Sequence, residues 1–401
     1  MMLAPKETEA KPSMKRATTL VHSGRHPEDY QGAVNPPVYH VSTVTYPTVG
    51  EMRAAEKNPF DGMRYGRFGT PTSFALEEAV CALEGGYRSI STASGLAAIT
   101  GTLSALMSAG DHLLMVDSTY FPTRRFCNDH LARWGIETTY YDPTIGADIA
   151  ALIRPNTKVI YVEAPGSLTF EMQDIPAIAA VAHAHGALVV MDNTWSAGLY
   201  FQPFEKGVDV SIQAGTKFIV GHSDAMLGLI TCAAEPLWRK IKSTLASQGV
   251  CAGAEEVYLG LRGLRTLGVR LRQHQESGLA LARWLQRRPE VIRVLHPALP
   301  EDPGHAIWKR DFTGACGLFS FELTPCSKEA VDAFLDGLEF FGIGYSWGGF
   351  ESLIIPTDGD VKRTAVPWKS GPMLRIHTGL EDPDDLIADL AKGFDRLKAI
   401  G

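Results

Sequence analysis

Short apolar segments that alternate with helical segments between residues 112 and 232 are the feature that most constrains the fold. The helical pattern is clearest over residues 122–134 and 175–185. Strands that are apolar along their whole length are buried on both faces, as in a mainly parallel sheet covered by helices on both sides. The predicted strands are 112–116, 138–141, 159–162, 188–191, 208–212 and 226–232. This alternation predicts an α/β domain.

The segments on either side of this region have different patterns. Up to about residue 70, prolines and glycines are frequent and periodicity is weak, which predicts a tail and an extended arm that lies across another surface, and helical patterns begin at Ser73 and at Leu96. After it, strands at 318–321, 353–355 and 374–377 and helices at 328–338 and 383–397 predict a smaller α+β unit. We therefore expect three parts: tail and arm (1–70), large domain (71–288) and C-terminal α+β domain (289–401).

Composition and charge exclude several classes of protein. With 45% hydrophobic residues and a formal net charge of −7, the 401-residue chain should be globular, and it lacks the positive charge that binds nucleic acid or an anionic membrane. No apolar run approaches the ~18 residues that span a membrane. The six cysteines form no Cys-x-x-Cys pair, and the N-terminal segment has no signal-peptide core. We therefore expect a cytoplasmic protein with reduced thiols and no metal.

A lysine and an aspartate at two predicted strand ends are the sharpest candidate for a functional site. Asp192 directly follows one apolar strand, and Lys217 follows the next in a loop with Gly215 and Thr216. The carboxyl ends of parallel strands form the ligand-binding edge of an open α/β sheet. A structural ion pair between the two side chains is one interpretation of this pattern.

A pyridoxal phosphate (PLP) site is the other interpretation. PLP chemistry needs a lysine for a Schiff base and a carboxylate that keeps the pyridine nitrogen protonated. It also needs backbone donors at a helix N-terminus for the phosphate. Ser94-Gly95-Leu96 forms a strand-to-helix turn that supplies such donors. Each element is common alone, but the three are rarely found together in this order.

Several motifs occur together and in a familiar order. They are Tyr65-Gly66-Arg67, Leu83-Glu84-Gly85-Gly86, Asp192-Asn193-Thr194, Thr216-Lys217-Phe218, Gly221-His222-Ser223-Asp224 and residues 260–267. The chain resembles the cysteine/methionine-metabolism family of PLP enzymes from about residue 14 to residue 400. The resemblance implies an aspartate-aminotransferase-like fold (PLP-dependent transferase fold type I), whose large domain has a mainly parallel seven-stranded sheet. It also implies PLP as the cofactor and a small amino acid as the substrate.

The resemblance implies a role for each residue around the cofactor. Lys217 would hold PLP as a Schiff base and then carry protons, while Asp192 would pair with the pyridinium nitrogen. Tyr120 would stack on the ring and help to orient or deprotonate the substrate amine. From the residues alone, Tyr120 is equally a packed aromatic side chain. Phosphate-binding roles are implied for Gly95, Leu96 and Thr216.

The resemblance also implies which residues bind the substrate and which reach the site from a neighbouring subunit. Arg375 would clamp the substrate α-carboxylate with its guanidinium fork, assisted by Ser346, and Trp347 would line the cavity. Tyr65 and Arg67 would reach the phosphate from a neighbouring subunit, and Tyr65 would also contact substrate. From the residues alone, Arg375 is equally a partner in a structural ion pair, and Tyr65 and Arg67 are ordinary loop residues.

Three positions bear on which reaction the resemblance implies. Ala214 stands where many members have a serine that serves the phosphate, which puts one phosphate hydrogen bond in question. Ser167 or Leu168 occupies the region where many γ-acting members carry asparagine, as in the bacterial β-acting members. Trp347 replaces the leucine of the Ser-Leu-Gly-Gly segment that γ-acting members usually have.

The implied activity is a carbon–sulfur β-lyase that cleaves L-cystathionine to homocysteine, pyruvate and ammonia in methionine biosynthesis. A γ-lyase or γ-synthase, or a β-lyase acting on cysteine or other S-conjugates, stays open within the family. A PLP-binding regulatory protein without turnover is the alternative from another class, although binding alone would not need Arg375. The implied assembly is a homo-oligomer, a tetramer built from dimers that share active sites.

Overall fold

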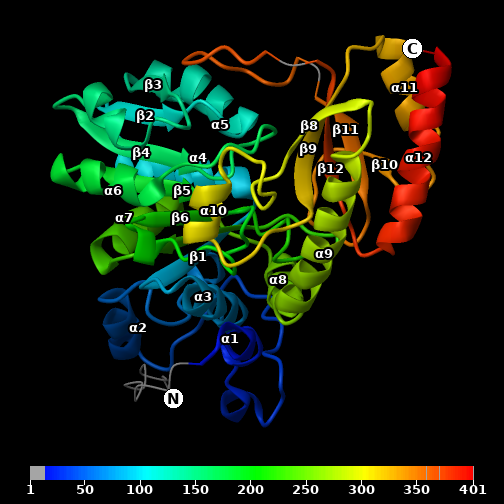
Figure 1. The fold of residues 1–401 in the computed structure, drawn as a ribbon. Helices are drawn as coiled ribbons and strands as arrows, with labels where there is room; N and C mark the ends of the chain where they lie inside the picture. The colour runs from blue at the N-terminus through cyan, green and yellow to red at the C-terminus, as the bar shows by residue number, and fades with distance from the viewer. Residues whose placement is uncertain (1–13, 358, 370, 401) are drawn as a thin grey trace.

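The computed structural model describes residues 14–357, 359–369 and 371–400, which form two sheets with helices packed around them (Figure 1). The predicted tail, residues 1–13, lies outside the described residues. Within them, no helix is long and apolar enough to cross a membrane.

A seven-stranded sheet forms the centre of the large domain. Its strand order is β1-β7-β6-β5-β4-β2-β3. Strand β7 is antiparallel to both of its neighbours and the other pairs are parallel, so the predicted mainly parallel sheet is confirmed. The strands are β1 (Arg88–Thr92), β2 (His112–Val116), β3 (Glu137–Tyr141), β4 (Thr157–Glu163), β5 (Leu188–Asp192), β6 (Val210–Gln213) and β7 (Gly228–Cys232).

Strand β1 is the one strand of this sheet that the apolar pattern does not predict. Its sequence, Arg-Ser-Ile-Ser-Thr, has a single apolar residue, yet all but its first residue are buried. Ser89 shares a hydrogen bond of 2.9 Å with Thr231, and the hydroxyl of Ser91 donates to the carboxylate of Glu77 at 2.8 Å. Because hydrogen bonds satisfy these buried hydroxyls, the strand does not need apolar side chains.

Alternate residues of the central strands enter two different hydrophobic cores. Leu114 and Ile160 belong to one core, and their neighbours Leu113 and Val159 belong to the other. Helices α3, α6 and α8 contribute to the first core, and α4 and α7 to the second. The sheet is therefore covered on both faces, as its apolar strands predict. The helices are α3 (Pro71–Glu84), α4 (Gly95–Leu106), α5 (Phe121–Phe126), α6 (Ile175–Ala184), α7 (Glu235–Ser247) and α8 (Ala254–Leu264).

A five-stranded sheet with the order β10-β11-β12-β9-β8 forms the C-terminal part of the chain. Helices α11 and α12 pack together beside this sheet (Figure 1). Helix α9 (Leu267–Leu285) joins the two parts, because Leu271 lies in the first core and Leu281 in the C-terminal core. The predicted boundary at residue 289 falls between the two sheets, and as a division into domains it stays a prediction. The remaining elements are β8 (Val291–Leu295), β9 (Leu318–Leu323), β10 (Gly342–Ile343), β11 (Leu353–Pro356), β12 (Met373–His377), α10 (His305–Asp311), α11 (Lys328–Asp336) and α12 (Pro383–Ile400).

The arm, residues 14–70, has little core of its own. It contains two short helices, α1 (Arg16–His22) and α2 (Val49–Glu56). Among its described large apolar side chains, only Leu20 and Phe60 are buried. Arg265 donates to the backbone carbonyl of Leu20 at 2.8 Å and fastens the start of the arm to the large domain. The rest of the arm therefore depends on other surfaces for burial.

Candidate active site

A cavity of about 660 Å³ lies at the carboxyl ends of the central strands, between the large domain and the loop that precedes β11. We call it the lysine cavity. Its lining includes every predicted site residue except Tyr65 and Arg67: Gly95, Leu96, Tyr120, Asp192, Thr216, Lys217, Ser346, Trp347 and Arg375. The fold thus brings together residues that are up to 280 positions apart in the chain. The roles implied for them stay predictions.

Asp192 is the last residue of β5, and one of its two oxygens is already engaged. The backbone N–H of Thr194 donates to Oδ1 at 3.0 Å, and the hydroxyl of Thr194 donates to the same oxygen at 2.5 Å. Within the described residues no hydrogen bond engages Oδ2. Burial raises the pKa of the Asp192 carboxyl, while the bonds from Thr194 and the charge of Lys217 oppose that shift. The geometry leaves one carboxylate oxygen for a cationic or N–H partner in the cavity.

Lys217 lies in the turn that follows β6, with its amine inside the cavity. Nζ donates to the hydroxyl of Ser346 at 2.5 Å and lies 5.3 Å from the centroid of the Trp347 ring. In the described part of the chain it forms no ion pair with Asp192, so the interpretation as a structural ion pair does not describe this lysine. Burial and the nearby charge of Arg375 lower the pKa of Lys217 to about 8, against the opposing effect of Asp192. An amine of this pKa is partly neutral, and therefore nucleophilic, near neutral pH.

Helix α4 points its N-terminus at the cavity. Ser94 caps the helix by accepting from the N–H of Ala97 at 3.1 Å, which leaves the N–H groups of Gly95 and Leu96 without partners among the described residues. A Cβ atom on Gly95 would lie 2.6 Å from the Cβ of Ala214, so only glycine permits this close packing. Free N–H groups at the start of a helix form a ready anion site.

The hydroxyl of Thr216 is less available than the prediction requires. It donates to the carbonyl of Leu227 at 3.1 Å and accepts from the N–H of Leu227 at 2.8 Å. Thr216 therefore lines the cavity, but donating its hydroxyl proton to a phosphate would break a backbone contact.

Arg375 reaches the cavity from β12 of the C-terminal sheet. Its Nη2 donates to the carbonyl of Ser346 at 2.9 Å. Among the described residues it has no ion-pair partner, so nothing supports the alternative of a structural ion pair. Burial lowers the pKa of Arg375 to about 10, against the opposing effects of Tyr120 and Asp360. A half-buried guanidinium without a carboxylate partner is suited to bind one from a ligand.

Tyr120 and Glu163 lie next to Asp192 at the same edge of the sheet. Tyr120 is 45% exposed, so its side chain is not the packed aromatic ring that the sequence left open as an alternative. Burial of its hydroxyl and the charge of Asp192 raise the pKa of Tyr120. Glu163 is the register neighbour of Asp192 across β4 and β5, and its Oε2 accepts from the N–H of Tyr120 at 2.8 Å.

The lysine cavity also contains residues that the sequence did not single out. Glu163 ends a predicted apolar strand as Asp192 does, and the same rule would have found it. Arg363 comes from the loop before β12 and donates to the carboxylate of Glu171 at 2.9 Å, which brings that loop against the large domain. No local pattern marks Arg363, because its partners are far away in the sequence.

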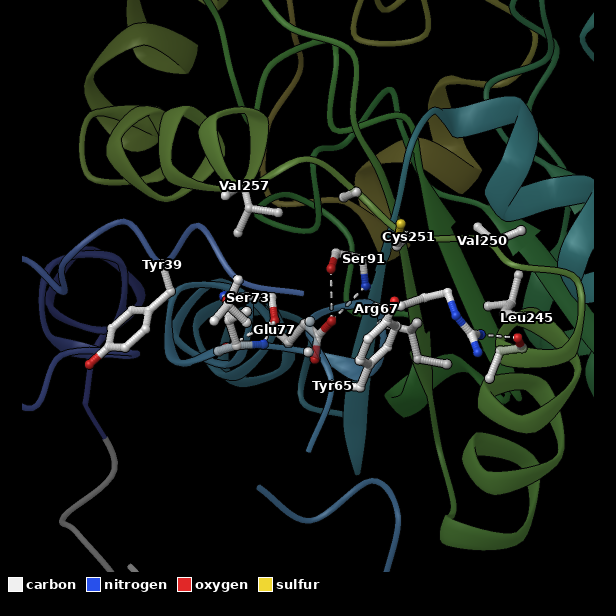
Figure 2. Close-up of a pocket in the computed structure, with 18 of the residues that line it drawn as sticks. Tyr39, Tyr65, Arg67, Ser73, Glu77, Ser91, Leu245, Val250, Cys251 and Val257 are labelled. Carbon is white, nitrogen blue, oxygen red and sulfur yellow. Dashed lines mark hydrogen bonds between the residues drawn. The ribbon is translucent and has the colours of Figure 1, made fainter. Parts of the chain in front are cut away.

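Tyr65 and Arg67 line a second cavity of about 440 Å³, which we call the arm cavity (Figure 2). Tyr65 is 43% exposed, and a guanidinium nitrogen of Arg67 donates to the carbonyl of Ala246 near the end of α7. Figure 2 shows both side chains beside the hydrogen-bonded pair Glu77 and Ser91. Neither residue lines the lysine cavity of its own chain, so their predicted contribution needs a second subunit.

The Cys/Met metabolism PLP-dependent enzyme family matches residues 17–395. The chain belongs to this family. Cystathionine β-lyase of Salmonella typhimurium is 46% identical over 95% of this chain and 98% of its own length. Cystathionine β-lyase of Escherichia coli is 44% identical over 96% of this chain and 99% of its own length. The crystal structure of cystathionine γ-synthase from Xanthomonas oryzae, in complex with aminoacrylate and cysteine, has a TM-score of 0.89 at 31% identity and covers 97% of this chain and 100% of that one.

Family membership identifies PLP as the cofactor and the fold as aspartate-aminotransferase-like, type I. The residues present fit that group. Lys217 offers an amine with a lowered pKa, Asp192 offers an unengaged oxygen for the pyridine N–H, and the start of α4 offers free amides for the phosphate. Tyr120 exposes an aromatic ring to the same space. The donors and charges around the cavity therefore match the three chemical parts of PLP.

Proposed function

We propose that this enzyme cleaves the Cβ–S bond of L-cystathionine and releases homocysteine, pyruvate and ammonia. One observation carries the proposal: the amine of Lys217, the unpaired guanidinium of Arg375 and the ring of Trp347 share one cavity. Relatives named cystathionine β-lyase that are 44–46% identical over nearly the full length support it. The solved γ-synthase structure is more distant, at 31% identity.

Arg375 binds the substrate by its α-carboxylate. Because Nη2 is held by the carbonyl of Ser346, the guanidinium keeps one orientation, and Arg375 lines the cavity. A bidentate guanidinium–carboxylate contact fixes both position and direction. The contact therefore sets which substrate carbon lies above Lys217.

Lys217 carries the protons. PLP, when bound, withdraws electrons from the substrate Cα and so acidifies the Cα–H bond. Lys217 would hold PLP through its amine, and with substrate bound the neutral amine would remove the Cα proton. The electron pair left at Cα forms the Cα–Cβ double bond as the Cβ–S pair leaves with sulfur. The same Nζ returns the proton to the departing thiolate, and hydrolysis of the aminoacrylate product gives pyruvate and ammonia.

Trp347 favours β- over γ-elimination in this proposal. A γ-acting enzyme must move a second proton, from Cβ, before sulfur leaves Cγ, so its substrate sits differently over the lysine. The indole ring lies 5.3 Å from Nζ and fills space beside the carboxylate clamp. Reacting atoms must approach within ~3–3.5 Å, so a shift of this wall changes which carbon the lysine reaches.

We also propose the setting in which the enzyme works. Tyr65 and Arg67, which line the arm cavity of one chain, serve the phosphate of the neighbouring subunit, which makes the active unit a homo-oligomer, a tetramer of site-sharing dimers. The proposed place is the cytoplasm, in methionine biosynthesis, with no nucleic-acid or membrane partner. The net charge of −7 supports the absence of polyanionic partners.

The test is turnover of the purified holoenzyme on L-cystathionine, L-cysteine and a simple S-alkyl cysteine. We expect pyruvate from L-cystathionine at the highest kcat/KM. Pyruvate only from the other two substrates would remove the substrate assignment and leave β-elimination intact. PLP binding without any keto acid from the three would support the regulatory alternative.

A further inference from the structure

In the loop of residues 346–349, Ser346 has a backbone conformation that residues with a side chain rarely adopt, and the loop lies directly on Lys217. Ser346 has a φ of 82° and Gly348 a φ of 88°, both in the left-handed region. A Cβ atom on Gly348 would lie 3.0 Å from the backbone of Lys217. A strained loop persists only where its surroundings hold it. The contacts that hold this loop therefore decide where Ser346 and Trp347 stand.

Strand β12 holds the loop at two points. Arg375 and His377 are two residues apart on β12, so their side chains lie on the same face of the sheet. Arg375 donates to the carbonyl of Ser346 at 2.9 Å, and the N–H of Gly348 donates to Nε2 of His377 at 3.1 Å. One contact belongs to the substrate clamp. The other belongs to a buried histidine that does not line the lysine cavity.

Hydrogen-bond accounting fixes the tautomer of His377. Nε2 lies 3.1 Å from the N–H of Gly348 and 3.3 Å from the carbonyl of Gly349, while the buried Nδ1 has no partner in the described structure. If Nε2 carried the proton, the N–H of Gly348 would lose its acceptor and Nδ1 would still be unpaired. The backbone N–H of Gly348 points at Nε2 and makes the shorter of its two contacts, so Nε2 must offer a lone pair and the proton lies on Nδ1. His377 is therefore an acceptor for the loop.

The rings of Phe218 and His274 pack against this imidazole and keep it in place and neutral. The His377 ring lies 5.9 Å from Phe218 and 5.2 Å from His274, and Phe218 in turn lies 5.3 Å from Trp347. Burial lowers the pKa of His377 well below its usual value, and His274, Arg375 and Lys217 add to the shift. A protonated ring would lose the lone pair that accepts from Gly348, so neutrality preserves the contact.

We propose that His377 is a positioning residue of the active site, which holds the N–H of Gly348 so that Ser346 meets Lys217 and Trp347 forms the cavity wall. It touches neither substrate nor cofactor and acts through the 346–349 loop. The inference rests on the proposed function only for the choice of substrate in the assay.

Two substitutions distinguish the role of Nε2 as an acceptor from the packing of the His377 ring. His377→Phe keeps a ring against Phe218 and His274 but leaves the N–H of Gly348 unpaired. His377→Gln loses the ring but places an amide oxygen close to the position of Nε2. We expect the Phe variant to lower kcat/KM by about tenfold or more, mainly through a higher KM. The reason is that the carbonyl of Ser346, which holds Arg375, moves with the loop. The Gln variant should stay within about threefold of the native enzyme.

A readout without turnover accompanies the kinetics. Hydrogen–deuterium exchange in the peptide that contains Gly348 should speed up by about tenfold in His377→Phe and change little in His377→Gln. His112→Phe is the control, because His112 is as deeply buried but starts β2 of the seven-stranded sheet and does not line the lysine cavity. It should lower the melting temperature without changing KM or the exchange of this peptide.

The inference fails if the Phe and Gln variants have the same KM and the same exchange, or if Phe matches the native enzyme in both. If the Phe variant does not fold, His377→Asn replaces it, since its shorter side chain cannot reach Gly348 and should behave as Phe is expected to. A native enzyme that makes no pyruvate overturns the proposed function instead, and the exchange comparison still decides the role of His377.

Discussion

The lysine cavity and the arm cavity differ in what holds their functional side chains. In the lysine cavity, Asp192 ends a central strand and is fixed by Thr194, and Lys217 follows the next strand of the sheet. In the arm cavity, Tyr65 and Arg67 come from a segment with almost no core of its own. The first set is positioned by one chain. The second set reaches no reacting group within its own chain, which points to a site completed by a second copy.

Among the changes to the two cavities, loss of Lys217 should lower turnover the most. Lys217→Ala removes both the anchor for PLP and the proton carrier, so we expect turnover to fall by about 10³- to 10⁴-fold and the absorbance of covalently held PLP to disappear. Lys206→Ala is the control, since Lys206 pairs with Asp311 at 2.9 Å outside both cavities. Near-native rates in Lys217→Ala would remove the lysine cavity as the active site.

Loss of Arg375 should affect substrate binding more than cofactor binding. We expect Arg375→Ala to raise KM for L-cystathionine by about 10- to 100-fold, the scale of a charge-assisted hydrogen bond. PLP content should stay close to native, which absorbance at saturating PLP measures. An unchanged KM would show that the carboxylate binds elsewhere.

Loss of Arg67 should affect cofactor binding more than substrate binding. Arg67→Ala is expected to weaken PLP affinity by about tenfold, as titration of the apoenzyme measures, with little change in melting temperature. Mixing this variant with Lys217→Ala should restore activity, because a mixed dimer contains one site with both side chains intact. No recovery on mixing, or native PLP affinity in Arg67→Ala, would contradict a shared site.

The smallest expected effect is a shift in the pH dependence of PLP capture by the lysine cavity. Only the neutral amine attacks the aldehyde, so the rate of PLP capture by the apoenzyme should rise with pH through a midpoint near 8. Arg375→Gln removes a charge that lowers the pKa of Lys217, so its midpoint should move up, and Asp192→Asn should move it down. A midpoint near 10.5, the usual value for lysine, would mean that the amine is not buried.

The sequence predicts the lysine cavity better than the arm cavity for a physical reason. Asp192 and Lys217 follow apolar strands, and the geometry of a parallel sheet brings strand ends together without any further information. Arg375 comes from another sheet, and only the family resemblance connected it with them. Tyr65 and Arg67 have no local pattern that marks a role.

Other features are set by contacts between distant segments. Strand β1 is held by hydroxyl pairs such as Ser89 with Thr231, which a search for apolar runs does not find. The contact of His377 with Gly348 joins a strand to a loop 29 residues away, and no spacing rule predicts it. The predicted phosphate contact of Thr216 meets competition from the backbone of Leu227, which only the packed structure reveals.

The lysine cavity should break the Cβ–S bond of L-cystathionine. The most direct measurement follows an isotope label placed in the carbons on the cysteine side of that bond, during a single incubation with the holoenzyme. We expect labelled pyruvate, unlabelled homocysteine and ammonia in equal amounts, all abolished by Lys217→Ala. Labelled cysteine together with unlabelled 2-oxobutyrate would show cleavage at Cγ and rule out β-elimination.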